Sequence, residues 1–292
     1  MFAIVGILVV FGAVLCGFLM EKGPVLVLVQ PSELLIIGGA ALGTLIAGNP
    51  LHVLKKIVSS VVRVVKGQGY SKARYLDSLK MMLLLFNKAR KGGLIDLESD
   101  IEEPEKSPVL SKFPEFLKHQ HARDFVCDTM RMAITGGATP FDLDQMMELD
   151  MEVHHASASE PAHALATMAD ALPGMGIVAA VLGVVITMSA LGGPPEEIGR
   201  KVAAALVGTF LGILLCYGVV GPLASMVTKM IDEEHAYYHV LRVTMLSYLK
   251  GMPPSLAVEV ARRAVPEHVR PSFQEFEKAC RQRETLVETT AA

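Results

Sequence analysis

The stretch ALPGMGIVAAVLGVVITM, residues 171–188, carries no charged side chain and contains one proline and three glycines. Its length approaches the roughly 20 apolar residues that cross a hydrocarbon layer about 30 Å thick. Glycine costs about 1 kcal/mol and proline about 3 kcal/mol relative to alanine in a helix interior. A segment that only had to lie in lipid would gain from leucine, so this composition indicates a membrane span that also makes a specific contact.

Other windows of the chain are also free of charge. Because 51% of the residues are hydrophobic and only 20% are charged, the apolar residues gather into blocks. The first window has no basic leading region and no small-residue cleavage site, so we expect a retained span there rather than a signal peptide. The charge-free windows are 1–20, 34–54, 171–195 and 202–228. They predict an all-α integral membrane protein with four transmembrane helices, at residues 1–20, 31–50, 171–192 and 202–227.

The distribution of Lys and Arg predicts the topology. Residues 55–131 hold fifteen of them and the tail after residue 228 holds nine, whereas the connection at 193–201 holds two. Basic residues favour the cytoplasmic side of a membrane. We therefore expect a large helical cytoplasmic insert between spans 2 and 3, at 51–170, and a helical cytoplasmic tail at 228–292, with both termini in the cytoplasm.

Helix signals recur in the insert. Ser71 is a candidate N-cap, the pair Gly92-Gly93 is a candidate stop, and Thr139 with Pro140 is a candidate cap and first turn. No alternating strand pattern competes with these signals.

The four windows contain no Asp, Glu, Lys or Arg at mid-depth, although a proton or cation path through a bilayer usually needs an ionisable group. They do contain hydroxyls, and a Thr or Ser in a span commonly bonds a carbonyl of its own helix. Small residues four positions apart indicate close helix packing. The hydroxyl residues are Thr44, Thr187, Ser189, Thr209 and Tyr217, and the small pairs are Gly39 with Gly43, Ala179 with Gly183, and Gly208 with Gly212.

Two prolines lie near the expected cytoplasmic ends of spans 3 and 4. Pro173 and Pro222 each remove a backbone donor and can bend a helix, although a proline in a first turn is harmless. We expect the two prolines to lie at one membrane level, as a matched pair that couples the membrane to the cytoplasmic helices.

Four motifs of the chain resemble one known family. They are QPSELLIIGGA (30–40), ARKGGLIDLESDIEEP (89–104), LPGMGIVAAVLGVVITM (172–188) and LVGTFLGILLCYGVVGPLA (206–224). They are similar to the MotA proteins, the proton-channel subunits of the bacterial flagellar stator within the wider MotA/TolQ/ExbB family, in the same order over nearly the whole chain. TolQ and ExbB proteins have three spans in all, so the extra amino-terminal span favours the MotA branch. A TolQ/ExbB-type energy-transducing subunit is the alternative.

The resemblance implies a stator subunit in the bacterial inner membrane. Five copies are expected to surround a MotB dimer, whose single transmembrane helix brings the aspartate that takes the proton. Pro173 and Pro222 match functional prolines of the family, and Thr209 matches the hydroxyl that lines the ion path. Sodium-driven relatives carry a threonine where this chain has Ala180, so the expected ion is the proton.

The resemblance also implies a rotor contact. Arg90 and Glu98 match the Arg and Glu that meet oppositely charged residues of the rotor switch protein FliG. By their spacing alone, both would be ordinary solvated charges.

Other function classes lack a motif. His154, His155 and His163 with Glu160 have no HExxH spacing, and adjacent histidines point to different faces of a helix, so we expect neither a metal site nor a cofactor. The chain has no GxSxG, P-loop or dinucleotide fingerprint, so we do not expect an enzyme. Its basic residues are interspersed with acidic ones and form no stripe for nucleic acid.

Overall fold

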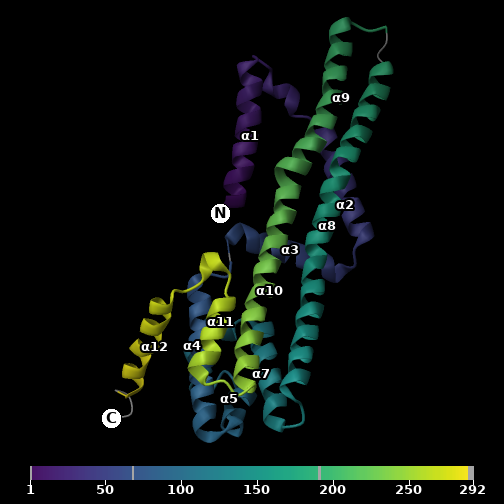
Figure 1. The fold of residues 1–292 in the computed structure, drawn as a ribbon. Coiled ribbons are helices and arrows are strands. Elements are labelled where there is room, and N and C mark those ends of the chain that lie inside the picture. The colour runs from purple at the N-terminus through teal and green to yellow at the C-terminus, as the bar shows by residue number, and fades with distance from the viewer. Residues whose placement is uncertain (1, 68, 190–191, 289–292) are drawn as a thin grey trace. The chain divides into compact units, whose positions relative to one another are not determined.

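A computed structural model describes residues 2–67, 69–189 and 192–288 (Figure 1). Every regular element in these ranges is helical, which confirms the expected all-α fold class. The chain divides into two compact units, with boundaries inside the long helices α8 and α10. We call Met1–Gln68 with Ala158–Ile231 the membrane unit, and Gly69–Ser157 with Asp232–Ala292 the insert-and-tail unit.

Within the described residues, four helical stretches are long and apolar enough to cross a membrane, as the sequence predicts. Residues 1, 190 and 191 of the expected spans, and residues 68 and 289–292 of the expected cytoplasmic segments, lie outside the described residues. The four stretches are Ala3–Met20 in α1 (Phe2–Met20), Val25–Gly48 through the short 3₁₀ helix η1 (Val25–Leu28) and α2 (Pro31–Gly48), part of α8 (Pro140–Met188), and part of the run Pro195–Leu249.

The helix α8 begins at the expected cap and continues much further than expected. The hydroxyl of Thr139 accepts a hydrogen bond from the Asp142 N–H at 3.2 Å, and the Asp142 carboxylate accepts one from the Thr139 N–H at 2.9 Å. This reciprocal pair satisfies two free donors of the first turn. The helix then runs for 49 residues, through Pro161 and Pro173, to Met188. The third apolar stretch is therefore the end of a long helix and not a separate helix that starts near Ala171.

A π-helical turn interrupts the fourth apolar stretch. α9 (Pro195–Leu215) is followed by η4 (Cys216–Val220) and then directly by α10 (Gly221–Leu249). The N–H of Gly221 donates to the carbonyl of Cys216, five residues earlier. The next residue, Pro222, has no N–H, and in a regular α-helix its ring would clash with the carbonyl four residues earlier. The wider turn accommodates the proline without ending the helix.

Predicted capping residues define the helices of the insert-and-tail unit. The Ser71 hydroxyl accepts from the Arg74 N–H at 3.4 Å at the start of α4, and α4 ends at Gly92, before Gly93 with φ 85°. Both predictions are confirmed. The elements of this unit are α4 (Lys72–Gly92), η2 (Leu94–Leu97), α5 (Glu98–Glu102), η3 (Leu110–Lys112), α6 (Pro114–Leu117), α7 (Gln120–Thr135), the first part of α8, the last part of α10, α11 (Pro254–Ala264), η5 (Glu267–Val269) and α12 (Phe273–Glu288).

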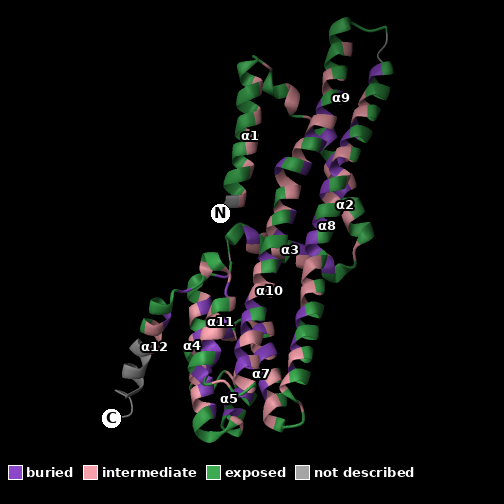
Figure 2. Cartoon of the chain, in the orientation of Figure 1, coloured by how far each residue is buried: buried purple, intermediate pink, exposed green. Residues whose placement is uncertain are grey.

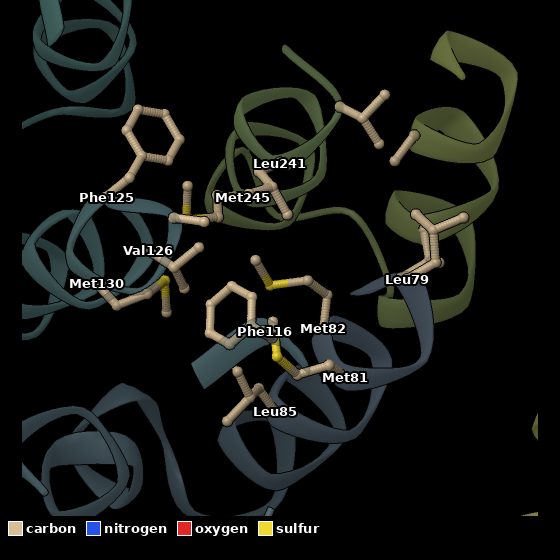
Figure 3. Close-up of a cluster of buried hydrophobic side chains, with 14 of the residues drawn as sticks. Leu79, Met81, Met82, Leu85, Phe116, Phe125, Val126, Met130, Leu241 and Met245 are labelled. Carbon is tan, nitrogen blue, oxygen red and sulfur yellow. The ribbon is translucent and has the colours of Figure 1, made fainter. Parts of the chain in front are cut away.

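The insert-and-tail unit has a well-packed apolar core. Figure 3 shows side chains from α4, α6, α7 and α10 that point toward one another, with Phe116 close to the methionines of α4. Met81, Met82 and Leu85 are completely buried there. Each buried side chain of this size contributes about 1.5–3 kcal/mol relative to its exposed state, so this unit has a core like that of a soluble domain.

The membrane unit leaves much of its apolar surface uncovered. α3 (Leu51–Lys66), the middle of α8 and the first part of α10 bury a small cluster, but Figure 2 shows α1 largely exposed along its length. One face of α8 is also exposed, including Ile177, Val181 and Val185. Apolar surface of this extent needs lipid or other chains to cover it.

Candidate functional site

The helices α8 and α9 lie side by side (Figure 1) and approach closely at their glycines. A methyl group added at Gly212 would lie 2.6 Å from the carbonyl oxygen of Leu172, and one added at Gly183 would lie 2.7 Å from the Ala205 Cβ. Real Cβ atoms do not come so close to their neighbours. The glycines that weaken the isolated helix therefore permit this contact, which we call the α8–α9 seam.

The predicted small pairs differ in what they contact. Those in α8 and α9 pack within the chain, as predicted, because a methyl group at Gly208 would lie 3.3 Å from the Ala179 Cβ. The pair in α2 does not, since added methyl groups at Gly39 and Gly43 meet no atom within 4 Å. Close packing at that pair would need another chain.

Two of the predicted ion-path residues lie at one level of the seam. A methyl group at Gly208 would lie 3.3 Å from the backbone nitrogen of Ala180, and Thr209 is the next residue of α9. Ala180 and Thr209 are both half-buried, and no other described residue bonds the Thr209 hydroxyl. The structure therefore brings Ala180 and Thr209 together on either side of Gly208.

An acidic side chain that no sequence motif indicates also reaches this level. Glu33, in the first turn of α2, is only 6% exposed and lies within the candidate span Val25–Gly48. Its Oε2 atom would be 2.7 Å from a methyl group at Gly208, and it has no hydrogen-bond partner among the described residues. The charge-free window 34–54 begins one residue after Glu33 and therefore excludes this side chain from the candidates. In the structure, the first turn of α2 nevertheless packs against the middle of α9, at Gly208.

The two prolines do not lie at one level. Pro173 is close to the contact between Leu172 and Gly212, and Pro222 is ten residues beyond Gly212 along the chain. At a rise of 1.5 Å per residue, the ten residues from Gly212 to Pro222 extend about 15 Å, so Pro222 lies roughly that far along the helix axes from the level of Pro173. The expectation of a matched pair at one level is wrong. Pro173 is also not in a first turn, because it lies deep inside α8.

Most of the other span hydroxyls bond their own helices. Thr44 donates to Ala41 at 2.9 Å, Thr187 to Gly183 at 2.8 Å, and Ser189 to Ile186 at 2.6 Å. The local interpretation of these three hydroxyls is confirmed. Tyr217, in η4, is 74% exposed and belongs to none of the buried clusters of the described residues.

The two predicted rotor-contact residues are on the surface of the insert-and-tail unit. Arg90 is exposed in the last turn of α4, and Glu98 is exposed at the start of α5. Neither forms an ion pair with another residue of the described ranges. Arg90 lines a surface pocket with Leu94 and Tyr248, and the burial of Tyr248 raises the pKa of its phenol.

The histidines of the insert-and-tail unit face different neighbours. The rings of His154 and His121 stack at 3.8 Å, and His154 Nε2 lies 3.5 Å from a Glu234 carboxylate oxygen. His155 instead meets His235, at 4.7 Å between ring centroids. No group of three or more His, Cys, Asp or Glu residues in the described ranges could hold a metal ion.

Comparison with known proteins identifies the family. Residues 4–93 match the model of the motility protein A N-terminal domain, and residues 117–239 match that of the MotA/TolQ/ExbB proton channel family. The chain is 38% identical to motility protein A of Salmonella typhimurium and 39% identical to that of Escherichia coli, over 96% of this chain and 95% of each relative. The chain belongs to the MotA/TolQ/ExbB proton channel family. It is therefore a multi-pass membrane protein of a channel family and not of an enzyme family.

Members of this family with solved structures share the fold. A structure of C. jejuni MotAB matches with a TM-score of 0.76, at 19% identity, over 93% of this chain and 98% of that chain. The flagellar MotAB stator complex from Bacillus subtilis matches with a TM-score of 0.69, at 23% identity, over 88% of this chain and 92% of that one. A further relative, chemotaxis protein LafT of Vibrio parahaemolyticus, is 34% identical over 94% of this chain.

In this member of the MotA/TolQ/ExbB family, the seam brings together more than the motifs indicate. The sequence motifs predict Ala180, Thr209 and the glycines, but they do not indicate the Glu33 carboxyl or the π-helical turn before Pro222. The signal for Glu33 is its position three residues after Gln30 in QPSE, which sets a first helical turn and not a solvated loop. The signal for the turn is the Gly221-Pro222 pair inside an otherwise continuous apolar helix.

Proposed function

We propose that this chain is the channel subunit of a bacterial flagellar stator, which converts proton flow into torque on the rotor. The match to motility protein A over 96% of the chain carries the proposal. Solved relatives of the same fold are named as MotAB complexes, which supports a MotB-type partner for this chain.

The membrane unit is placed in the bacterial inner membrane, with spans at 1–20, 31–50, 171–192 and 202–227. The cytoplasmic segments are 51–170 and 228–292, and both termini are cytoplasmic. The excess of Lys and Arg in these two segments supports this orientation.

A ring of five copies around a partner dimer is proposed for the assembly. The uncovered apolar faces of α1 and α8 support contacts with other chains and with lipid. The open surface beside Gly39 and Gly43 supports a close approach of a further helix to α2.

The ion path is proposed to pass the level of Ala180 and Thr209. The partner's aspartate takes a proton at this level, and its loss of charge changes how the partner helix packs against α8 and α9. A buried charge costs several kcal/mol more than its neutral form, which is enough to shift a two-state arrangement. Pro173 and the π-helical turn before Pro222 are positions where α8 and α9 can bend as the ring steps around the partner.

The rotor contact is proposed to involve Arg90 and Glu98, which would meet charges of opposite sign on FliG. Both side chains are exposed and have no intramolecular ion pair in the described ranges, so their charges are available to a partner. Exposed pairs are worth about 0.2–1 kcal/mol each, which suits a surface that engages and releases repeatedly.

Reconstitution tests the proposed function directly. The purified chain, with and without the single-span protein that copurifies with it, would be placed in liposomes and proton uptake measured under an imposed pH gradient. We expect uptake only with the partner, because the proposed path needs the carboxylate that the partner's helix brings. Equal uptake without the partner would contradict the arrangement, and a copurified partner of TolR or ExbD type would assign the chain to the other branch of the family.

A further inference from the structure

The Glu33 carboxyl occupies an unusual place in the membrane unit. It crosses from the first turn of α2 to the backbone of α9 at Gly208, beside Thr209, and opposite the Ala179–Ala180 segment of α8. The side chain is 6% exposed, and Oε2 has no hydrogen-bond partner in the described part of the chain. A buried polar atom with no partner costs free energy, so its retention needs an explanation.

The surroundings of Glu33 favour its neutral form. The buried cluster beside it includes the apolar side chains of Ile37, Val207 and Leu211. Glu33 forms no ion pair or hydrogen bond with another residue of the described ranges. A carboxylate with no cation and no hydrogen-bond donor would lose several kcal/mol on leaving water. The protonated form of Glu33 is therefore the favoured one while α2, α8 and α9 are packed as in this structure.

Gly208 fits this interpretation. A methyl group there would lie 2.7 Å from Oε2 and would displace the carboxyl. The absence of a side chain at Gly208 therefore leaves space both for the Glu33 carboxyl and for the close approach of α8. Oε2 lies beside Gly208, and Thr209 is the next residue of α9.

From these observations we propose that Glu33 is a proton-exchanging group of this chain's own ion path, in addition to the carboxylate that the partner brings. In one half of the exchange, the O–H bond of Glu33 breaks and the proton passes to a water molecule on the Thr209 side, which leaves a carboxylate. In the other half, a hydrated proton re-forms the O–H bond and releases water. The inference rests on the proposed function, because it needs a proton path beside the seam.

Two substitutions separate proton exchange from simple packing. Glu33→Gln has the size of the protonated acid and is neutral, but it cannot exchange a proton; Glu33→Asp is shorter but keeps the acid. If Glu33 exchanges protons, flux decreases in the order wild type, Asp, Gln. If Glu33 is only a neutral packing group, Gln behaves as wild type and Asp is the more damaging change.

The experiment measures gradient-driven proton uptake into liposomes that hold the full chain assembled with its single-span partner. We expect Glu33→Gln to lower the flux about tenfold or more, as for the loss of an acid–base group, and Glu33→Asp to retain an intermediate flux. Gly208→Ala keeps the acid but displaces it, so we also expect a lower flux. Glu196→Gln, which changes an exposed carboxylate in the first turn of α9, is the matched control and should leave the flux unchanged.

Infrared difference spectra of the same complexes add a measurement that packing does not affect. We expect a protonated-carboxyl band that is absent in Glu33→Gln and that changes when the proton gradient is applied. Wild-type flux in Glu33→Gln would overturn the inference. A Glu33 band that ignores the gradient would also overturn it, even if both substitutions reduce flux. Absence of flux in the wild-type complex would instead count against the proposed function.

Discussion

At the scale of single residues, the α8–α9 seam is set by the absence of methyl groups. Gly212 faces the backbone of Leu172 and Gly176, at distances where no side chain fits. Gly174, two residues before Gly176 in α8, has no atom within 4 Å of an added methyl group. The two glycines have the same intrinsic cost in a helix, but only Gly212 is needed for a contact.

Gly212→Ala should therefore destabilise the membrane unit, and Gly174→Ala should not. The added methyl group at Gly212 would overpack the seam at a cost of about 1–3 kcal/mol, whereas Gly174→Ala gains helix propensity. The thermal unfolding midpoint of the purified complex measures the difference, with proton flux as a second readout. Equal midpoints for the two variants would show that α8 and α9 are not in contact at Gly212.

The proposed rotor contact is also argued at this scale. Reversal of both charges, Arg90→Glu with Glu98→Arg, should leave folding and proton flux unchanged, because both side chains are exposed and unpaired within the described ranges. Exposed substitutions usually change stability by less than about 0.5 kcal/mol. Rotation of tethered cells should nevertheless slow strongly, since the reversed charges would repel the rotor.

The matched control reverses a neighbouring exposed pair, Glu103 and Lys106, whose charged atoms lie 3.0 Å apart. Rotation should be normal in that variant. Normal rotation at both low and high load in the Arg90 and Glu98 double variant would make these two residues ordinary surface charges.

At the scale of elements, the π-helical turn is the feature that α9 and α10 share. It inserts a wider turn between two helices that would otherwise form one regular helix. The side chains of α10 are therefore rotated about the helix axis, compared with a regular continuation of α9. Turns of this kind are frequent at functional sites. The turn places the bend before Pro222, at a different level from Pro173.

Pro222→Ala should therefore preserve or raise stability while it impairs rotation. Alanine restores the N–H and removes the ring, so the run Pro195–Leu249 can become a regular α-helix, and proline costs about 3 kcal/mol relative to alanine in a helix interior. The thermal midpoint and the rotation speed of tethered cells measure the two effects. Pro195→Ala, at the first position of α9, is the control and should change neither. Full-speed rotation of Pro222→Ala would remove the proposed role of the turn.

The elements also separate what the sequence could predict from what it could not. Caps and stops such as Ser71, Gly93 and Thr139 act within one turn, and they were predicted correctly because their signals are local. The level of Pro222 and the burial of Glu33 depend on how far one helix extends past another, which no local pattern specifies. The continuity of α8 through Pro173 was missed for the same reason, since packing on both sides of a proline can outweigh its local cost.

At the scale of the whole molecule, the insert-and-tail unit should respond to acid. Burial, and then the neighbouring His154, lower the pKa of His121 from its ordinary value of 6.5, while Asp150, Glu234 and Asp124 oppose this shift. Burial also lowers the pKa of His235. A histidine whose pKa is lowered in the folded chain binds fewer protons there than in the unfolded chain. The free energy of unfolding is therefore unaffected by the protonation of this histidine above pH 6.5 and decreases as the pH falls below 6.5.

Denaturant unfolding of the full chain in detergent at pH 8 and pH 5.5 tests this effect. We expect the wild type to be less stable at pH 5.5, and His121→Gln to lose part of that difference because Gln does not titrate. His268→Gln, at an exposed position, is the control and should retain the whole difference. A pH response that is identical in the wild type and in His121→Gln would assign the acid sensitivity to other groups.

The choice of ion is a property of the assembled molecule, and we expect proton drive. A sodium ion must exchange its hydration shell for several oxygen ligands, and a missing ligand costs a few kcal/mol at a site with few others. At the level of Ala180, the described side chains offer the Thr209 hydroxyl and the enclosed Glu33 carboxyl, while the Thr187 hydroxyl is already bonded to Gly183. A proton needs only one carboxylate and can arrive along water.

Rotation of the motor in sodium-free medium, with an uncoupler titration, tests this choice of ion. Rotation should persist without sodium and stop as the proton gradient collapses. Rotation that instead requires sodium and survives the uncoupler would mean that a neighbouring chain completes an oxygen site beside Ala180.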